Sequence, residues 1–294
     1  MLKGILAVIA GSLIFGVEPS GNNYVLMGGM SASCLLFYQA LVMSIASFGL
    51  AYTGKNTLHI SKRDISEIAG IGFLGIYLTS LFLNIAYTHL TVSMTILLNF
   101  LYPTVVLIIS ATLFHERVTM RHVLAIALGF AGLICVLDFS RTDADLTGMM
   151  FALLSGICYA VYCVANERSR VGTFPLPVRL FYMSVTACII AAIQTVGTGT
   201  FMLPADRKTA AIIVFVIGIG CVSAYGLVLY GIRGIGAGRA AVINMLEPVA
   251  AVFFGILFFR EPLTKRMIAG GVFILLSILL VALESRVSDK EGSM

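Results

Sequence analysis

Long apolar runs, separated by short charged segments, constrain this sequence more than any other feature. The runs are about 20 residues long, the length that an α-helix needs to cross a hydrocarbon core of about 30 Å. Of the 294 residues, 59% are hydrophobic and 11% are charged, whereas soluble domains carry about 45–50% and about 25%. The chain has too few charges to cover a surface in water, and we predict an all-α polytopic membrane protein.

Ten such runs can be traced, and the basic residues between them predict the orientation. We expect transmembrane helices at about 3–28, 31–53, 65–88, 91–114, 119–138, 146–166, 176–199, 209–232, 237–259 and 264–284. With both termini cytoplasmic, thirteen of the 19 Lys and Arg residues lie on the cytoplasmic side and six on the other. Basic residues concentrate on that side, and no organelle-targeting segment is evident. We therefore predict a multi-pass protein of the bacterial cytoplasmic (inner) membrane.

The fourth and ninth predicted helices, with the segments after them, repeat one another. When 99–121 is set over 244–266 without a gap, seven of the 23 positions are identical, among them Asn99/Asn244, Pro103/Pro248, Glu116/Glu261 and Thr119/Thr264. Such a repeat divides the chain into two units of five helices, 1–140 and 145–294. Because five is odd, the two units enter the membrane from opposite sides. The sequence thus predicts inverted-topology repeats, an arrangement typical of secondary transporters.

The repeated pattern, a proline, an apolar run and then Glu-x-x-Thr, resembles the EamA family of the drug/metabolite transporter superfamily. The aromatic-Gly pair Phe15-Gly16 is also similar to that family's first helix. The resemblance covers nearly the whole chain and implies a ten-helix, exporter-type carrier with a central cavity between its repeats. It implies no particular solute, because the family carries amino acids, nucleosides and other metabolites. Phe15 stands where typical members have Trp, so a cavity contact is expected to differ.

A carboxylate, Glu247, lies about ten residues inside the ninth predicted helix. A charge at the bilayer centre costs roughly 2.5–3.5 kcal/mol on insertion scales, so this side chain should face a cavity or a partner. Asn244 lies on the same helix face, and Pro248 removes a backbone hydrogen bond there and kinks the helix. We interpret Glu247 and Asn244 as candidates for solute binding. The alternative is purely structural, with Glu247 paired to Arg179 or Arg233.

The first half carries Asn99, Tyr102 and Pro103 at the equivalent positions, so the charge is present in one half only. We include Asn99 and Tyr102 among the solute-binding candidates, and we interpret Pro103, Pro248 and Pro19 as hinges. Such an asymmetry favours a role specific to one solute or ion.

The other candidates are polar residues inside apolar runs. Glu18 precedes Pro19, so a carboxylate stands beside a kink here as at Glu247-Pro248. The alternative is that the first helix stops at Val17 and Glu18 is a solvated cap. The remaining candidates are polar side chains at helical spacing or alone in a helix, each of which could serve packing instead: Tyr159, Tyr162, Asn84 and Tyr38. We expect Glu116, Glu261, Thr119 and Thr264 to be structural, with each Thr capping the helix after a tight corner.

These patterns favour a secondary carrier that exports a small organic metabolite, amino-acid-like or drug-like, by alternating access. Glu247, with Glu18 as second choice, is the candidate for carrying a coupled proton. The sequence contains no Walker A motif, catalytic cluster or metal-ligand spacing, so we expect no enzyme activity, no cofactor and no metal. The expected partners are the solute and the lipid bilayer, without nucleic acid; the oligomeric state stays open and a monomer is compatible. A passive channel and a non-transporting assembly subunit are the alternatives.

Overall fold

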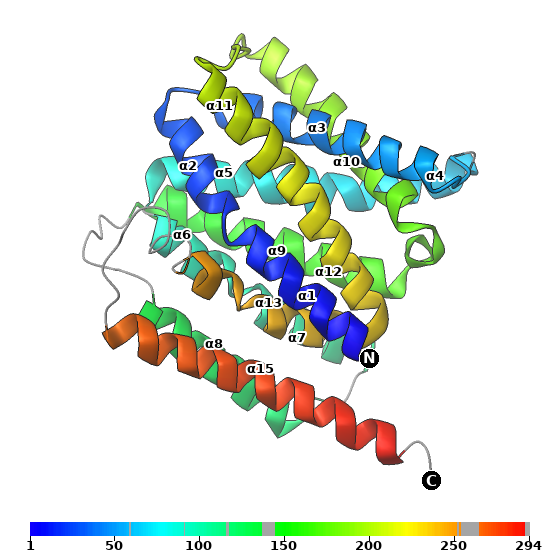
Figure 1. Ribbon diagram of the computed structural model, residues 1–294, viewed down its shortest axis with the longest axis vertical. Helices are drawn as coiled ribbons and strands as arrows, with labels where there is room; N and C mark the ends of the chain where they lie inside the picture. The colour runs from blue at the N-terminus through cyan, green and yellow to red at the C-terminus, as the bar shows by residue number, and fades with distance from the viewer. Residues whose placement is uncertain are drawn as a thin grey trace.

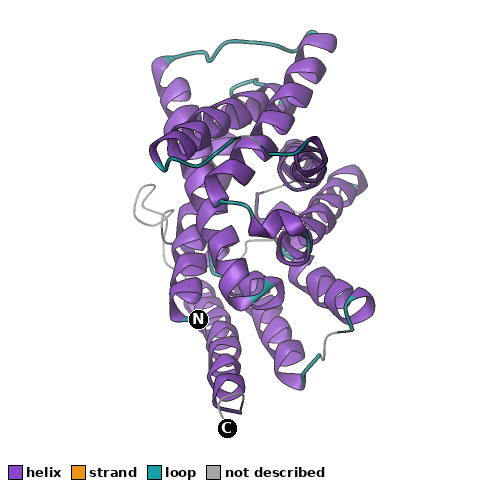
Figure 2. Cartoon of the chain, turned by 90° about the vertical axis from the view of Figure 1, so that its right-hand side faces the viewer, coloured by secondary structure: helices purple, strands orange, loops and turns teal. Residues whose placement is uncertain are grey.

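The structure, a computed structural model, describes residues 1–58, 60–90, 92–115, 118–136, 145–251, 253 and 265–291. Within these ranges the chain is helical and contains no strand (Figure 2). The helices are α1 Leu2–Phe15, α2 Glu18–Met27, α3 Ala32–Thr53, α4 Lys62–Gly72, α5 Thr79–His89, α6 Val92–Asn99, α7 Tyr102–Leu113, α8 Met120–Val136, α9 Leu146–Arg168, α10 Leu176–Gly197, α11 Arg207–Ala211, α12 Cys221–Ile235, α13 Ala237–Asn244 and α15 Lys265–Glu291. A 3₁₀ turn, Arg170–Thr173, follows α9, and two π-helical segments, Phe73–Leu78 and Ile212–Gly220, join α4 to α5 and α11 to α12.

Seven helical stretches in the described part of the chain are long and apolar enough to cross a membrane, which confirms the polytopic all-α class. They are Leu2–Met27, Ala32–Thr53, Lys62–His89, Met94–Leu113, Leu146–Arg168, Leu176–Gly197 and Arg207–Ile235. The fifth and tenth predicted helices coincide with the shorter apolar stretches Met120–Cys135 and Ile268–Leu280. The ninth, predicted at 237–259, lies partly outside the described residues.

The helices pack in pairs that join segments far apart in the sequence. The largest contacts are between α3 and α10, α8 and α15, α1 and α12, and α5 and α9. Figure 1 shows α3 with α10 along one edge of the molecule and α8 with α15 along the opposite edge. The contact between α1 and α12 runs over Gly4, Gly11 and Gly231, where the backbones approach so closely that an added Cβ would be crowded. Small residues are what membrane helices use for such close packing.

Polar contacts bring the ends of distant helices together at two ends of the bundle. At one end, Asp64 at the start of α4 lies 3.7 Å from Arg170 after α9, and the Arg168 guanidinium lies 5.1 Å from the centroid of the Phe114 ring. At the other end, the hydroxyls of Ser33 and Thr200 are 3.3 Å apart. The transmembrane stretches Ala32–Thr53 and Lys62–His89 therefore start at opposite ends, and Leu146–Arg168 and Leu176–Gly197 run in opposite directions.

Three transmembrane segments are each interrupted by two residues. In every case the next two residues are Glu-Pro or Tyr-Pro. The breaks are Gly16-Val17 between α1 and α2, Phe100-Leu101 between α6 and α7, and Met245-Leu246 after α13. The prolines therefore stand at the second residue of the following helix, where the missing N–H costs no hydrogen bond. The kinks expected at Pro19, Pro103 and Pro248 thus take the form of two-residue turns, at which Gly16, Val17, Leu101 and Met245 keep right-handed helical dihedrals.

Asp145 holds the start of α9 and offers a test of this end of the bundle. Its Oδ1 accepts a hydrogen bond from the Thr147 N–H at 2.8 Å, and its Oδ2 lies 2.7 Å from Nδ1 of His89. The bond with His89, followed by that with Thr147, holds the pKa of Asp145 below its ordinary value of 3.8. A carboxyl group whose pKa is lowered by folding stabilises the protein above the unfolded pKa, and this stabilisation is lost as the pH falls through the folded pKa.

We therefore expect Asp145→Ala to lower the thermal midpoint in detergent at pH 7, with the difference from the unaltered protein shrinking below pH 3.8. Thermal unfolding followed by circular dichroism between pH 7 and pH 3 measures this. Glu67→Ala, which removes only an exposed pair with Arg63, is the matched control. If the thermal midpoints of Asp145→Ala and the unaltered protein differ by the same amount from pH 7 to pH 3, the ionised Asp145 carboxylate does not stabilise the fold.

Candidate functional site

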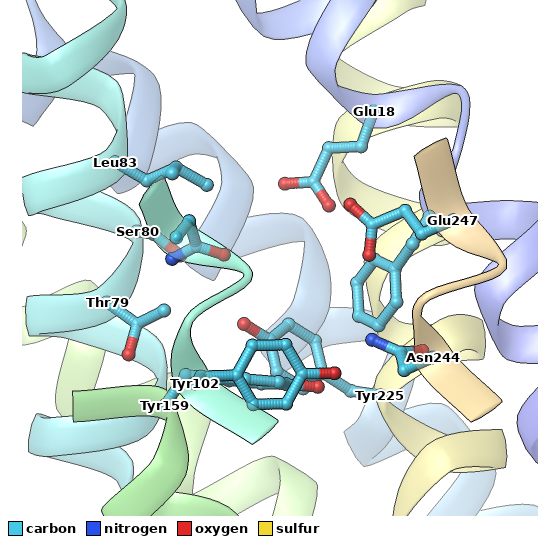
Figure 3. A pocket seen from close by; sticks show the side chains of 11 residues that line it. Glu18, Thr79, Ser80, Leu83, Tyr102, Tyr159, Tyr225, Asn244 and Glu247 are labelled. Carbon is cyan, nitrogen blue, oxygen red and sulfur yellow. The ribbon is translucent and has the colours of Figure 1, made fainter. Parts of the chain in front are cut away.

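A small cavity lies inside the bundle where the three helix breaks meet (Figure 3). Six of the residues singled out from the sequence line it, three from 1–140 and three from 145–294: Glu18, Asn99, Tyr102, Tyr159, Asn244 and Glu247. The cavity measures about 50 Å³. Sites for small molecules usually measure about 300–1,000 Å³, so in this conformation the space accommodates a few water molecules and no metabolite.

Glu18 begins α2, directly after the break in the first transmembrane segment. Its Oε1 accepts hydrogen bonds from Nε2 of Gln39 at 3.1 Å and from Nδ2 of Asn22 at 3.3 Å. The side chain is half-buried and points into the cavity (Figure 3). Because the chain is helical again from Glu18 to Met27, within one stretch that runs from Leu2 to Met27, Glu18 is not the solvated end of the first helix.

Glu247 begins the helix that follows the break after α13, and it is also half-buried. In Figure 3 its carboxylate points into the same space as that of Glu18. The alternative ion pair with Arg179 or Arg233 is not among the ion pairs of the described residues. Arg179 is fully buried elsewhere and donates from Nη1 to Oδ1 of Asn166 at 3.1 Å, whereas Arg233 is exposed.

The two asparagines that end α6 and α13 are each held by a serine from the other half of the chain. Nδ2 of Asn99 donates to Oγ of Ser155 on α9 at 3.0 Å. The Ser12 hydroxyl on α1 donates to Oδ1 of Asn244 at 2.8 Å. Both asparagines therefore fix the position of a helix break against the opposite half, besides lining the cavity.

Aromatic rings form one wall of the cavity, which we call the aromatic wall: Phe15, Tyr102, Tyr159 and Tyr225. The rings of Tyr102 and Tyr159 meet edge to face at 4.9 Å, and those of Phe15 and Tyr225 do so at 5.1 Å. The Tyr102 hydroxyl donates to the Ala241 carbonyl at 3.2 Å. In Figure 3 the three labelled tyrosines lie on the side of the cavity opposite the two carboxylates.

Three candidates lie away from the cavity. Tyr162 is fully buried behind Tyr159, with the two rings stacked at 5.8 Å. Asn84 is fully buried, and neither of its amide atoms has a hydrogen-bond partner among the described residues. Tyr38 donates to the Met202 carbonyl at 3.1 Å, at the end of the bundle that carries Ser33.

The corner residues are described in part. Thr119 lies just before α8, where its hydroxyl accepts a hydrogen bond from the His122 N–H at 3.3 Å. This is the capping geometry expected for it. Glu116, Glu261 and Thr264 lie outside the described residues.

Sequence reasoning did not single out Thr79, Ser80, Leu83 and Tyr225, all of which line the cavity. Ser80 and Tyr225 stand 145 positions apart, the same offset that separates Asn99 from Asn244 and Tyr102 from Glu247. Applying this offset to every polar residue in an apolar run would have found both. The described residues contain no group of three or more His, Cys, Asp or Glu side chains that could hold a metal ion.

Comparison with known proteins identifies the family. A sequence profile described as the EamA-like transporter family matches residues 2–138 and again 146–283. An uncharacterized transporter of Archaeoglobus fulgidus is 24% identical over 262 residues, covering 86% of this chain and 94% of the relative. The uncharacterized transporter YcbK of Bacillus subtilis is 24% identical over 295 residues, with 93% and 91% covered.

A solved crystal structure shares the fold with a TM-score of 0.81 at 16% identity, over 96% of this chain and 97% of the other. The family match, the relatives and the apolar helices agree on one class of protein. The chain therefore belongs to the EamA-like transporter family and is a multi-pass membrane transporter.

Proposed function

We propose that this transporter is a secondary carrier that exports a small organic solute by alternating access, with the cavity as its solute site. The observation that carries the proposal is the convergence of three interrupted helices on one cavity, two of them beginning again with a carboxylate. Interrupted helices of this kind bind solutes and coupling ions in secondary transporters. Because the cavity measures about 50 Å³, a solute needs a second conformation in which the site is open.

The packing of the helices supports two inverted repeats, 1–140 and 145–294, with five helices in each. In the two repeats α1 corresponds to α9, α5 to α12, α3 to α10 and α8 to α15. The contact of α1 with α12 therefore has its counterpart in that of α9 with α5, and each of the other two pairs, α3 with α10 and α8 with α15, joins corresponding helices. The two serine–asparagine contacts exchange in the same way. In such repeats, one half rocks against the other around the site.

In our proposal both termini are cytoplasmic in a bacterial inner membrane, as the distribution of basic residues favours. We place the aromatic wall on the cytoplasmic side of the cavity, where it would close the path to the cytoplasm. Rotation of the halves would part Tyr102 from Ala241, whose hydrogen bond joins the two halves across this wall. Glu247 or Glu18 is the group that would exchange the coupled proton.

Labelling of a cysteine in the cavity tests alternating access without knowledge of the solute. Ser80 is buried and lines the cavity. We expect Ser80→Cys to react with a membrane-impermeant maleimide in right-side-out and in inside-out vesicles, because the site opens to each side in turn. The native chain, with its own six cysteines, supplies the background, and mass spectrometry locates the label.

Ser184→Cys is the matched control, since Ser184 is fully buried on α10 and its hydroxyl lies 3.2 Å from that of Ser44, away from the cavity. It should be protected from both sides. Labelling of Ser80→Cys from neither side, or from one side only, would contradict alternating access. A channel would also be labelled from both sides, but it would show no acceleration of efflux by solute on the opposite side of the membrane.

A further inference from the structure

We infer that the cavity selects a solute with a positively charged nitrogen, which rests between Glu18 and Glu247 while its apolar part lies on the aromatic wall. The inference deepens the proposed carrier function and rests on it. It comes from four features of the cavity: its charges, its rings, an unpartnered hydroxyl and the helix ends around it.

The charges that line the cavity are of one sign. Among the described residues, Glu18 and Glu247 are the two carboxylates of the lining, and no Lys, Arg or His lines it. In Figure 3 the two carboxylates point into the same space. Glu18 accepts hydrogen bonds from the neutral amides of Gln39 and Asn22 at the same oxygen, and the neutral thiol of Cys221 is a further donor beside it. Away from water, two such carboxylates need a counter-charge, which a proton or a cationic solute supplies.

The aromatic wall is suited to the same kind of solute. Its four rings form one continuous cluster, since Tyr159 lies 4.9 Å from Tyr102 and 6.5 Å from Tyr225, which contacts Phe15 at 5.1 Å. The face of an aromatic ring attracts a cation, and a cage of several rings is a known means of binding quaternary ammonium groups. A ligand placed between the three labelled tyrosines and the carboxylates would meet rings on one side and negative charge on the other (Figure 3).

The hydroxyl of Tyr159 points independently to a polar ligand. Tyr159 lines the cavity and is 6% exposed, and its hydroxyl has no hydrogen-bond partner among the described residues. The sulfur of Cys163, a weak acceptor, lies near it and offers at most a weak hydrogen bond. Buried hydroxyls are normally hydrogen-bonded. A primary ammonium group has three N–H donors, so it can serve this oxygen and a carboxylate together.

The helix ends around the cavity argue against an anionic solute. The start of a helix carries partial positive charge and ordinarily attracts anions. Two of the three helices that begin at this cavity begin with a glutamate, Glu18 or Glu247, so a negative charge already occupies those positions. A phosphorylated or carboxylate-only solute would meet repulsion from these groups, and no basic side chain among the described lining residues would offset it.

Binding of a matched series of benzyl compounds to the purified chain in detergent tests the inference. The series is benzyltrimethylammonium, benzylamine, benzyl alcohol, benzoate and phenylalanine, and isothermal titration calorimetry measures each affinity. We expect the two cations to bind at least about 10-fold more tightly than benzyl alcohol, as a charged contact provides, and benzoate not to bind. Phenylalanine should bind more weakly than benzylamine, because its carboxylate finds no basic partner.

Variants of the two glutamates identify the binding groups. Glu18→Gln and Glu247→Gln should each weaken binding of benzyltrimethylammonium by at least about 10-fold. Glu67→Gln, on the surface of α4, should leave it unchanged. The inference is overturned if neither cation binds, if benzoate or phenylalanine binds more tightly than benzylamine, or if both glutamine variants retain full affinity. If one of these results is obtained while Ser80→Cys is still labelled from both sides, the cationic solute class is wrong and the carrier function stands. If Ser80→Cys is labelled from one side only, the carrier function itself is wrong.

Discussion

Glu247→Gln should slow solute exchange by about 10- to 100-fold, since contacts to a charged group contribute about 1.5–3 kcal/mol and each 1.4 kcal/mol is a factor of ten. The same change should leave the folded protein equally stable or more stable. Glu247 is half-buried among apolar helices, and no described residue forms an ion pair with it, so neutralising it removes a desolvation cost. Opposite effects on function and on stability distinguish a carboxylate kept for transport from one kept for folding.

Exchange is best measured on a solute whose toxicity falls when the chain is overproduced in cells, after reconstitution of the protein into liposomes. If Glu247 exchanges a proton, the glutamine variant should also lose the dependence of transport on an imposed pH gradient. Glu67→Gln, which alters a half-buried carboxylate on α4 that pairs with Arg63 on the surface, is the control and should transport normally. An unchanged rate together with an unchanged response to the gradient would eliminate the role of Glu247.

Gly75→Ala should lower the free energy of unfolding by about 1–3 kcal/mol, the usual cost of forcing an extra group into a packed interior. Gly75 lies in the π-helical segment between α4 and α5, and a Cβ there would overlap the ring of Tyr162. Tyr162 is fully buried and is held between Tyr159 and Tyr225, whose ring centroids lie 5.8 Å and 5.9 Å away. Its ring therefore has no free space into which to move.

Gly70→Ala, in the same transmembrane stretch, is the matched control, because a Cβ at Gly70 meets nothing within 4 Å. This substitution should be neutral or stabilise the helix by up to about 1 kcal/mol. Unfolding by denaturant in detergent measures both variants. The double variant Gly75→Ala/Tyr162→Leu should lose less stability than the two single variants together, as expected for residues in contact. Equal stabilities for Gly75→Ala and Gly70→Ala would show that the contact is not present.

Features that depend on local sequence were predicted well. The class of protein follows from the length of the apolar runs, because each helix in a membrane satisfies its own backbone hydrogen bonds. The breaks follow from Pro19, Pro103 and Pro248, because proline is tolerated in the first turn of a helix but not in its interior, where its missing N–H and its ring break the helix. Their form, a two-residue interruption instead of a bend, needed the structure.

The candidate site was predicted in part. Glu18 and Glu247 were identified because the cost of a charge in the membrane is high at either position, whatever the neighbours. Tyr159 and Tyr162 could not be told apart in the same way. Both lie on the same stripe of α9, yet Tyr159 lines the cavity while Tyr162 packs behind it against Gly75. Tyr225 was missed because it lies in an apolar run with no charge beside it.

The sequence by itself determined that this chain is a polytopic helical membrane protein, where its helices break, and which carboxylates stand at the breaks. Only the tertiary structure decided that Glu18, Glu247 and the aromatic wall surround one cavity, and that Arg179 donates to Asn166 instead of pairing with Glu247. The physical reason is that lipid is as apolar as the interior of the bundle. Hydropathy therefore marks which residues lie in the membrane, but the helix face that meets another helix, and its partner there, depends on packing between segments far apart in the chain.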